Sequence, residues 1–193
     1  MAIIEYDCAI VGAGFVGATL AIALRKCGLK VLVLDGRTPL LEVGAEDVRG
    51  IALSPSSRFI FEDLDLWNGL AERAEPITAI NISEMGALPS VDLSASEAGI
   101  DALAYVVPAD HLLRTIENKL LEDAQTPDCQ LLWRTSLESY RVSSDHVSIT
   151  VVDHEQLRSE LSARLLIGAD GVNSKVRALA NIGSKIRAYN QHA

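Results

Sequence analysis

The chain has 193 residues, of which 49% are hydrophobic, so it is long enough to bury the core of one sizeable domain. Its formal net charge is −9, and its basic residues are scattered without a basic run. A nucleic-acid surface must neutralise phosphates, so this charge pattern argues against nucleic-acid binding.

The cysteines and the hydropathy pattern indicate the cellular compartment. Cys8, Cys27 and Cys129 are too few and too widely spaced for a disulfide framework or a metal site. We expect Cys8 and Cys27 to be buried as small hydrophobic residues. No apolar run is long enough for a transmembrane helix, and a reduced, cytoplasmic compartment fits best.

The first predicted element is a βαβ unit from about Tyr6 to Asp35. Its apolar strand runs into Gly12, Gly14 and Gly17, which have the G-x-G-x-x-G spacing of a dinucleotide-binding turn. In such a turn the first glycine allows the tight bend, the second lets the backbone approach a pyrophosphate, and the third lets the helix pack closely. The helix N-terminus adds unpaired N–H groups and a partial positive charge, so the pattern predicts a dinucleotide site.

Asp35 ends the second strand of this unit, 18 residues beyond Gly17. A carboxylate that binds ribose hydroxyls is expected about 20 residues after the glycines. The arrangement suits either NAD or FAD, and an acid at this position disfavours a 2′-phosphate. A βαβ turn that binds no ligand is the alternative.

The middle of the chain predicts a loop, one helix and three short strands. Residues 36–50 are polar and punctuated by glycine, as in a loop that crosses the edge of a cofactor. Ser54 and Pro55 have the positions of the N-cap and first residue of a helix. The apolar residues that recur in this helix are Phe59, Ile60, Leu64 and Trp67. We expect strands at 77–83, 91–93 and 104–107 to form part of a separate sheet.

The rest of the chain predicts one helix, three antiparallel strands and a glycine turn. Residues 109–124 carry one apolar stripe, formed by Leu112, Leu113, Ile116, Leu120 and Leu121. The strands are predicted at 137–142, 147–152 and 163–167, and we interpret the last as an apolar, buried strand. A new helix is expected near Asn173 or Ser174. Asp170, in the turn before it, either lies where α/β proteins bind ligands or caps this helix.

Three motifs together resemble a known family. They are G-A-G-F-V-G in the first turn, R-G-I-A-L-S from Arg49, and I-G-A-D-G-V-N-S-K-V-R from Ile167. Taken alone, Arg49 could reach a pyrophosphate or be a surface ion-pair partner. In combination the motifs resemble the aromatic-ring flavoprotein hydroxylases, most of all their ubiquinone-biosynthesis branch, over essentially the whole chain. D-x-R-G-I-A-L-S and I-T-A-I-N-I-S-E are similar to segments of the 2-octaprenyl-6-methoxyphenol hydroxylases, and 189–193 resembles that branch's Y-x-Q-x-A stretch.

The resemblance implies an α/β, Rossmann-like FAD/NAD(P)-binding fold with a parallel sheet, an antiparallel three-stranded excursion and part of a second, substrate-side sheet. The implied cofactor-binding residues are Gly12, Ala13, Gly14, Phe15, Val16, Gly17, Asp35, Arg37, Arg49, Asp170 and Gly171. The glycines would surround the FAD pyrophosphate, Asp35 would hold the adenosine ribose, and Arg49 would contact the flavin side. Asp170 and Gly171 match a motif implicated in both FAD and NAD(P)H contacts, and Arg177 would anchor it structurally. The resemblance assigns no catalytic residue and no metal.

The implied activity is hydroxylation of an aromatic ring, on a polyprenylated phenol of ubiquinone biosynthesis, with NAD(P)H as reductant and O₂ as oxygen donor. Such a lipophilic substrate implies a cytoplasmic protein peripheral to the inner membrane. Nothing amphipathic and basic here would bind a bilayer, so we expect contact through partners such as a ubiquinone-biosynthesis complex. Another flavoprotein on the same scaffold, such as a reductase or halogenase, and an inactive truncated FAD-binding fragment are the alternatives.

The resemblance also implies domain limits. Residues 1–75 and 109–183 would form a discontinuous FAD-binding domain, residues 76–108 would be partial substrate-domain strands, and residues 184–193 would start that domain's next, truncated segment. Ala109 or Asp110 stands where many relatives have Arg or Asn to help hold FAD. Family members are much longer, and their later Gly-Asp motif has no counterpart here. We therefore expect this chain to carry the N-terminal portion of the cofactor site.

Overall fold

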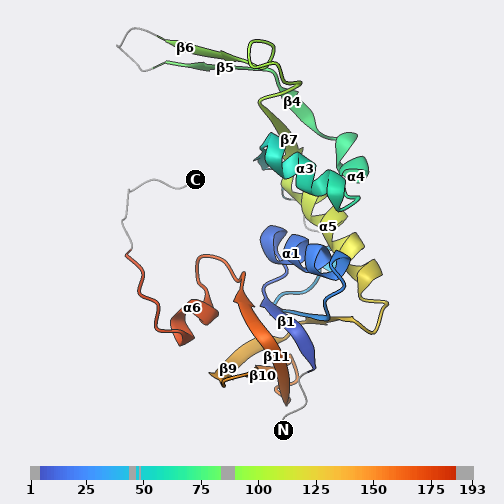
Figure 1. Ribbon diagram of the computed structural model, residues 1–193, viewed down its shortest axis with the longest axis vertical. Coiled ribbons are helices and arrows are strands. Elements are labelled where there is room, and N and C mark those ends of the chain that lie inside the picture. Colours follow the sequence, from blue (N-terminus) through green and yellow to red (C-terminus); the bar gives the residue numbers. More distant parts are fainter. Residues whose placement is uncertain (1–4, 44–46, 48, 84–89, 186–193) are drawn as a thin grey trace. The chain divides into compact units, whose positions relative to one another are not determined.

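The computed structural model describes residues 5–43, 47, 49–83 and 90–185 (Figure 1). The chain divides into two compact units, Met1–Thr38 with Ala124–Ala193 and Pro39–Asp123, and each is described by itself. These units do not coincide with the predicted domains, which concern cofactor and substrate roles and stay a prediction. The segment 189–193, which carries the Y-x-Q-x-A resemblance, lies outside the described residues. In the described ranges, no helix combines the length and the apolar character needed to cross a membrane.

A six-stranded sheet organises the first unit, in the order β8-β2-β1-β11-β10-β9. The first four strands of this order are parallel, whereas β11, β10 and β9 are antiparallel. The elements are β1 (Tyr6–Val11), α1 (Phe15–Lys26), β2 (Val31–Asp35), β8 (Cys129–Trp133), β9 (Ser136–Val142), β10 (Val147–Val152), β11 (Arg158–Gly168) and α6 (Lys175–Leu179). The predicted βαβ unit, parallel sheet and antiparallel excursion are therefore confirmed.

The central strands β1 and β2 are apolar because both of their faces are covered. Ala9, Ile10 and every residue from Val31 to Leu34 are fully buried. Helix α1 packs against both strands, and its buried small residues Gly17, Ala18 and Ala21 allow a close approach.

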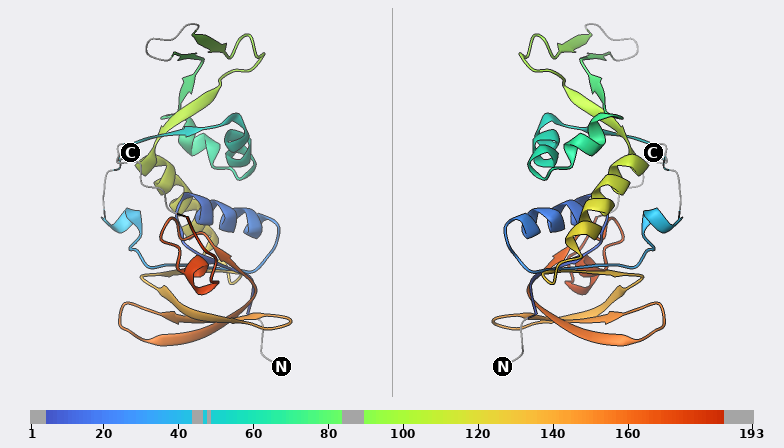
Figure 2. Two further views of the ribbon diagram at one scale, coloured as in Figure 1. Left: turned by 90° about the vertical axis from the view of Figure 1, so that its left-hand side faces the viewer. Right: turned by 90° about the vertical axis from the view of Figure 1, so that its right-hand side faces the viewer.

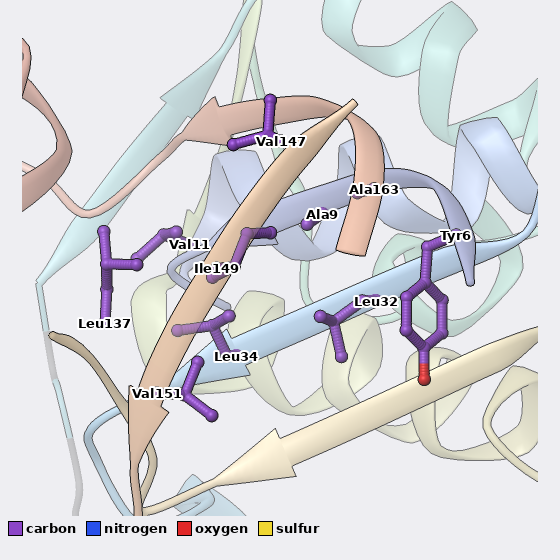
Figure 3. Close-up of a cluster of buried hydrophobic side chains, with 10 residues drawn as sticks. All are labelled: Tyr6, Ala9, Val11, Leu32, Leu34, Leu137, Val147, Ile149, Val151 and Ala163. Carbon is purple, nitrogen blue, oxygen red and sulfur yellow. The ribbon is translucent and has the colours of Figure 1, made fainter. Parts of the chain in front are cut away.

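Strands β9 and β10 turn back across one face of the parallel strands, so the first unit has a second β layer (Figure 2). Between the layers lies a hydrophobic cluster in which Ile149 and Val151 of β10 meet Leu32 and Leu34 of β2 (Figure 3). The other buried members are Tyr6, Ala9, Val11, Leu137, Val147 and Ala163. This cluster is the core that fixes the ends of β1 and β2, where the candidate site lies.

Two predictions for this unit were wrong in detail. Strand β11 is longer than expected and is not fully buried, since Leu165 is 53% exposed. Its first half pairs with β10 and its second half with β1, exchanging partners at Ala163, so each half has one open edge. Cys8 is buried as predicted, but Cys27 is exposed because it caps the C-terminus of α1.

In its described residues, the second unit contains two small antiparallel sheets, β3-β7-β4 and β5-β6, with four helices. Its strands are β3 (Gly50–Leu53), β4 (Glu75–Ile77), β5 (Ala79–Ile82), β6 (Val91–Ser94) and β7 (Ala104–Pro108). Its helices are α2 (Leu40–Val43), α3 (Pro55–Asp63), α4 (Trp67–Ala71) and α5 (Ala109–Asp123).

The predicted single sheet in this unit was wrong. The strand expected at 77–83 is two strands, β4 and β5, which belong to different sheets, and only β4 pairs with β7. The β5–β6 ribbon pairs Ile80 with Leu93 and Ile82 with Val91, and all four side chains are exposed. The alternation of apolar and polar residues correctly predicted an apolar face, but it does not determine which strands pair with each other.

The helices of the second unit follow their sequence signals. The hydroxyl of Ser54 accepts a hydrogen bond from the Ser57 N–H at 3.1 Å, and Pro55 begins α3 as predicted. Phe59 and Ile60 are exposed, so the apolar stripe expected in α3 is only partly buried. Helix α5 buries Leu112, Ile116 and Leu120 along one face, as predicted, whereas residues 36–50, expected as a loop, also contain the short α2.

Candidate functional site

A cleft of about 420 Å³ lies at the carboxyl ends of β1, β2 and β11 in the first unit. The chain leaves β1 toward β2 on one side, while β11 pairs with β1 on the other, and α/β sheets bind ligands at such a reversal. Six of the predicted cofactor residues line this cleft, namely Gly12, Gly14, Asp35, Arg37, Asp170 and Gly171. The structure therefore brings together parts of two motifs that are far apart in the sequence.

Gly12 and Gly17 are required by the packing of the turn itself. Gly12 has a φ of +103°, and a Cβ there would lie 2.4 Å from the Ala169 carbonyl oxygen. A Cβ on Gly17 would lie 1.9 Å from the Gly12 carbonyl oxygen. These glycines hold β1, α1 and the β11–α6 turn in close contact, as the spacing predicted for a tight bend and a closely packed helix.

Gly14 differs from the other two glycines because packing does not demand it. No described atom lies within 4 Å of a Cβ placed on Gly14, and its φ of −74° suits any residue. Gly14 nevertheless lines the cleft. A side chain here would project into space that the fold leaves open, which is the arrangement needed where a ligand must approach the backbone.

The N-terminus of α1 is open to an anion. The first N–H groups of any helix have no partner within the helix, and no side chain in the described residues caps them at Gly14. Ser54 and Ser174, by contrast, cap α3 and α6 with their hydroxyls. Half-buried Phe15 and exposed Val16 form the first turn of α1, which contains no acid. The helix therefore directs an uncompensated partial positive charge at this end.

Asp35 and Arg37 hold the glycine turn from the side. The Asp35 carboxylate accepts a 2.7 Å hydrogen bond from the Ala13 N–H, and the Arg37 guanidinium donates to the Ala13 carbonyl at 2.6 Å. The guanidinium also pairs with Asp35 at 3.3 Å and lies 5.0 Å from the centre of the Trp133 ring. The second carboxylate oxygen of Asp35 accepts a hydrogen bond from the backbone N–H of Arg37. Asp35 is thus fixed at the cleft wall.

Asp170 combines the two roles that the sequence left open. Its Oδ2 accepts hydrogen bonds from the N–H groups of Lys175 at 2.6 Å and Val176 at 3.2 Å, so it caps α6. Its Oδ1 is buried without a hydrogen-bond partner among the described residues, while the residue as a whole lines the cleft. Burial opposes its ionisation, yet hydrogen bonds from Ser174 and from these backbone groups hold the pKa of Asp170 below its usual range.

Arg49 lies in the second unit, where it forms an ion pair with Asp47. Its guanidinium donates three hydrogen bonds to the Asp47 carboxylate, at 2.6 to 3.2 Å, and these lower the pKa of Asp47 to about 2. The surface ion pair weighed from the sequence is therefore present, while the flavin contact stays a prediction. Arg177 donates to the Val172 carbonyl at 2.5 Å, in keeping with an anchoring role.

Several cleft residues were missed by sequence reasoning. They are Gly36, Thr135, Ser136, Leu137, Asn173 and Lys175. Those at 135–137 follow β8, which pairs in parallel with β2, and that pairing was the signal that could have placed them. The described part of the chain contains no group of three His, Cys, Asp or Glu residues able to hold a metal ion.

The chain is similar to two curated hydroxylases, one named for ubiquinone and one for demethoxyubiquinol. It is 34% identical to a ubiquinone hydroxylase of Rhodospirillum rubrum, covering 97% of this chain and 42% of that protein. It is 30% identical to the 3-demethoxyubiquinol 3-hydroxylase of Escherichia coli, covering 96% of this chain and 46% of that protein. The chain therefore spans less than half the length of these relatives.

The fold has counterparts among solved structures. The flavin-dependent monooxygenase PieE, determined in complex with FAD and substrate, matches with a TM-score of 0.75 and 21% identity, over 93% of this chain and 32% of PieE. Residues 5–191 match the model of a family described as the FAD-binding domain. With the glycine turn, the fixed carboxylate and the Asp-Gly turn around one cleft, this match over most of its length shows that the chain belongs to the FAD-binding domain family.

Proposed function

We propose that this chain forms the FAD-binding part of a monooxygenase that hydroxylates an aromatic ring. We further propose that the ring belongs to a polyprenylated phenol of ubiquinone biosynthesis, with NAD(P)H as reductant and O₂ as oxygen donor. The similarity to two ubiquinone-pathway hydroxylases over nearly the whole chain supports the substrate class. The lipophilic phenol would place the protein at the periphery of the inner membrane, in contact with other proteins of that pathway.

The observation that carries the proposal is the fit of the cleft to a dinucleotide. Gly14 leaves room for the close approach of a pyrophosphate to the backbone, beside a helix N-terminus that favours negative charge. The buried Oδ1 of Asp170 is an acceptor that a ligand hydroxyl or N–H could satisfy. A cleft with these two features suits the diphosphate and sugar hydroxyls of FAD.

Three residues of the cleft would have a role in binding. The N–H groups that follow Gly14 would hold the pyrophosphate, and Asp35 would accept hydrogen bonds from the adenosine ribose. Arg37 holds the Asp35 carboxylate in place, because its guanidinium pairs with that carboxylate and also donates to the Ala13 carbonyl. When bound, FAD supplies hydride acceptance from NAD(P)H and activation of O₂. The protein supplies orientation and shields the cofactor from water.

The proposal is tested with the purified chain in two steps. Titration with FAD, followed by flavin fluorescence, should give saturable binding and a flavin absorption spectrum. Oxidation of NADH or NADPH in air is then measured with and without a polyprenylated phenol, and mass spectrometry should detect a phenol that has gained one oxygen atom. Reactions without O₂ are the control.

Two results would contradict the proposal at different levels. A folded chain that takes up no FAD overturns the cofactor assignment. A protein that contains this chain together with the rest of the monooxygenase, binds FAD and oxidises NAD(P)H, but never transfers oxygen to the phenol, overturns the hydroxylase assignment and favours a reductase.

A further inference from the structure

A tryptophan packs against the arginine of the candidate cleft. Trp133 is the last residue of β8 and pairs in register with Asp35, the acid that ends β2. The centre of its indole ring lies 5.0 Å from the guanidinium carbon of Arg37, within the range of a cation–π contact. Among the described residues, Arg37 lines the cleft and Trp133 does not. The link between this tryptophan and the cleft therefore runs through Arg37.

The backbone that follows β8 holds the indole ring beside Arg37. The Arg134 N–H donates to the Arg37 carbonyl at 3.2 Å. The Thr135 N–H donates to the Asp35 carbonyl at 3.0 Å, and the Thr135 hydroxyl donates to the Trp133 carbonyl at 2.9 Å. Arg134 has a φ of +52°, a conformation that residues other than glycine rarely adopt. The contact between ring and guanidinium is thus fixed by hydrogen bonds between the two strand ends.

Arg37 joins two parts of the cleft wall. Its guanidinium pairs with the Asp35 carboxylate at 3.3 Å and donates to the Ala13 carbonyl at 2.6 Å. An arginine side chain has many rotamers, and the Arg37 side chain is 33% exposed, so holding it in one rotamer costs conformational entropy. A flat aromatic ring packed on the guanidinium favours that single rotamer, because a planar guanidinium stacks on aromatic faces.

We propose that Trp133 is a positioning residue for the bound nucleotide. It holds the Arg37 guanidinium, and through it the Asp35 carboxylate, in the orientation that recognises the ribose. The inference rests on the proposed function, because that function assigns Asp35 to the adenosine ribose. A hydrogen bond to a ribose hydroxyl depends on the direction of the carboxylate as well as on its presence. Loss of the ring should therefore weaken recognition of the hydroxyls although every group that touches the ligand is retained.

Two substitutions isolate the aromatic face of Trp133. The indole N–H is buried without a hydrogen-bond partner among the described residues, so Trp133→Phe keeps an aromatic face and breaks no hydrogen bond there. Trp133→Leu keeps an apolar side chain and removes the aromatic face. The matched control is Trp67→Leu. The half-buried Trp67 ring lies 5.2 Å from the Arg58 guanidinium carbon in the second unit and is not among the described cleft residues.

The measured quantity is the preference of the folded chain for ribose hydroxyls. Dissociation constants are determined for ADP and for 2′,3′-dideoxy-ADP, which share the adenine and the diphosphate. The ratio of the two constants therefore reports on the hydroxyls alone, and a general loss of stability leaves it unchanged. Far-UV circular dichroism checks that every variant is folded, and each variant is also titrated with FAD.

We expect Trp133→Leu to lower the preference for ADP about fourfold, with Trp133→Phe within about twofold of wild type and Trp67→Leu unchanged. Arg37→Met should lower the preference at least as much as Trp133→Leu does. In the Arg37→Met background, Trp133→Leu should cause no further decrease, because its effect passes through the guanidinium.

An unchanged preference in Trp133→Leu, where the wild-type chain binds FAD and prefers ADP, overturns this inference and leaves the proposed function standing. Equal decreases in the wild-type and Arg37→Met backgrounds also overturn it, since Trp133 would then act by another route. A wild-type chain that prefers ADP but takes up no FAD overturns the proposed cofactor, while the variants still decide the role of Trp133. A wild-type chain without any preference contradicts the role of Asp35 and this inference together.

Discussion

The first unit contains two strand-to-helix turns that meet at one cleft and are built in opposite ways. In the β1–α1 turn, the described residues provide no side-chain cap, and the following helix is 12 residues long. In the β11–α6 turn, Asp170 and Ser174 both accept backbone N–H groups of a helix of only 5 residues. The first turn thus offers its backbone to the cleft, whereas the second satisfies its own backbone and offers side chains.

The difference shows that glycine and aspartate contribute to a cleft in different ways, one by exposing the backbone and the other by presenting a side chain. Backbone N–H groups can face a ligand only if the surrounding side chains are absent, and Gly14 provides that absence. An aspartate can face a ligand only if something holds it, and the two N–H groups bound to Asp170 Oδ2 do so while Oδ1 points elsewhere. The two turns also support each other, since the Ala169 N–H donates to the Val11 carbonyl at 2.7 Å.

The largest expected effect on stability comes from adding a Cβ at Gly17, next to the first turn. In Gly17→Ala the new Cβ would lie 1.9 Å from a backbone oxygen, so α1 must move away from β1. We expect a loss of about 3 kcal/mol or more in the free energy of unfolding, measured in urea. Gly28→Ala is the control: Gly28 has a φ of +80° but open surroundings, so its loss should be about 1 kcal/mol. Equal losses would show that close packing is not what Gly17 provides.

The next prediction separates binding from folding in the same turn. Gly14→Val should raise the dissociation constant for FAD at least about 100-fold, because its side chain would occupy the space left for the pyrophosphate. The free energy of unfolding should change by less than about 1 kcal/mol, since no packing is disturbed. Fluorescence titration and urea unfolding give the two quantities. Gly183→Val, at an exposed open position outside the cleft, should alter neither, and undiminished FAD binding by Gly14→Val would sink the site assignment.

The smallest effect concerns the acid that caps the second turn. Asp170→Asn should lower the free energy of unfolding by about 1.5 kcal/mol at pH 7, because two charge-assisted hydrogen bonds are weakened. The folded-state pKa of Asp170 is lowered, so its stabilisation is complete above the unfolded pKa of about 3.9 and is lost as the pH falls through the folded value.

The difference between wild type and Asp170→Asn should therefore be constant from pH 7 to about 5 and shrink below about pH 4. Glu97→Gln, at an exposed carboxylate, serves as the control for changes in net charge. A difference that grows on acidification would contradict the capping role of the ionised Asp170.

Sequence patterns located the elements whose signals are local. The β1–α1–β2 unit follows from apolar runs around three glycines, and α3 begins at Ser54 and Pro55 because the cap and the fixed φ act within one turn. The position of the Asp-Gly turn at the cleft was also predictable, since β11 ends at Gly168, two residues before Asp170. Each of these signals needs no knowledge of distant residues.

The other features of the fold and the cleft depend on which distant segments come into contact. The periodicity of the sequence does not encode those contacts. The alternation at 77–83 could not show that the chain changes sheets between β4 and β5. Strand β11 exchanges pairing partners at Ala163, from β10 to β1, and no local pattern reveals such an exchange. The clamp that Arg37 forms on Ala13 joins residues that touch only after β2 has paired with β1.

The hydrogen bond between Val11 and Ala169 has a consequence for the order in which the fold can be completed. The glycine turn is synthesised early, but β11, which pairs with β1 beside this turn, is synthesised only after most of the chain. Pairing of such distant segments closes a long loop and is slow relative to local hairpins. Amide hydrogens of β1 should therefore gain protection from exchange late in refolding, together with those of β11. Flavin affinity would then report on completion of the sheet, and not on formation of the N-terminal βαβ unit alone.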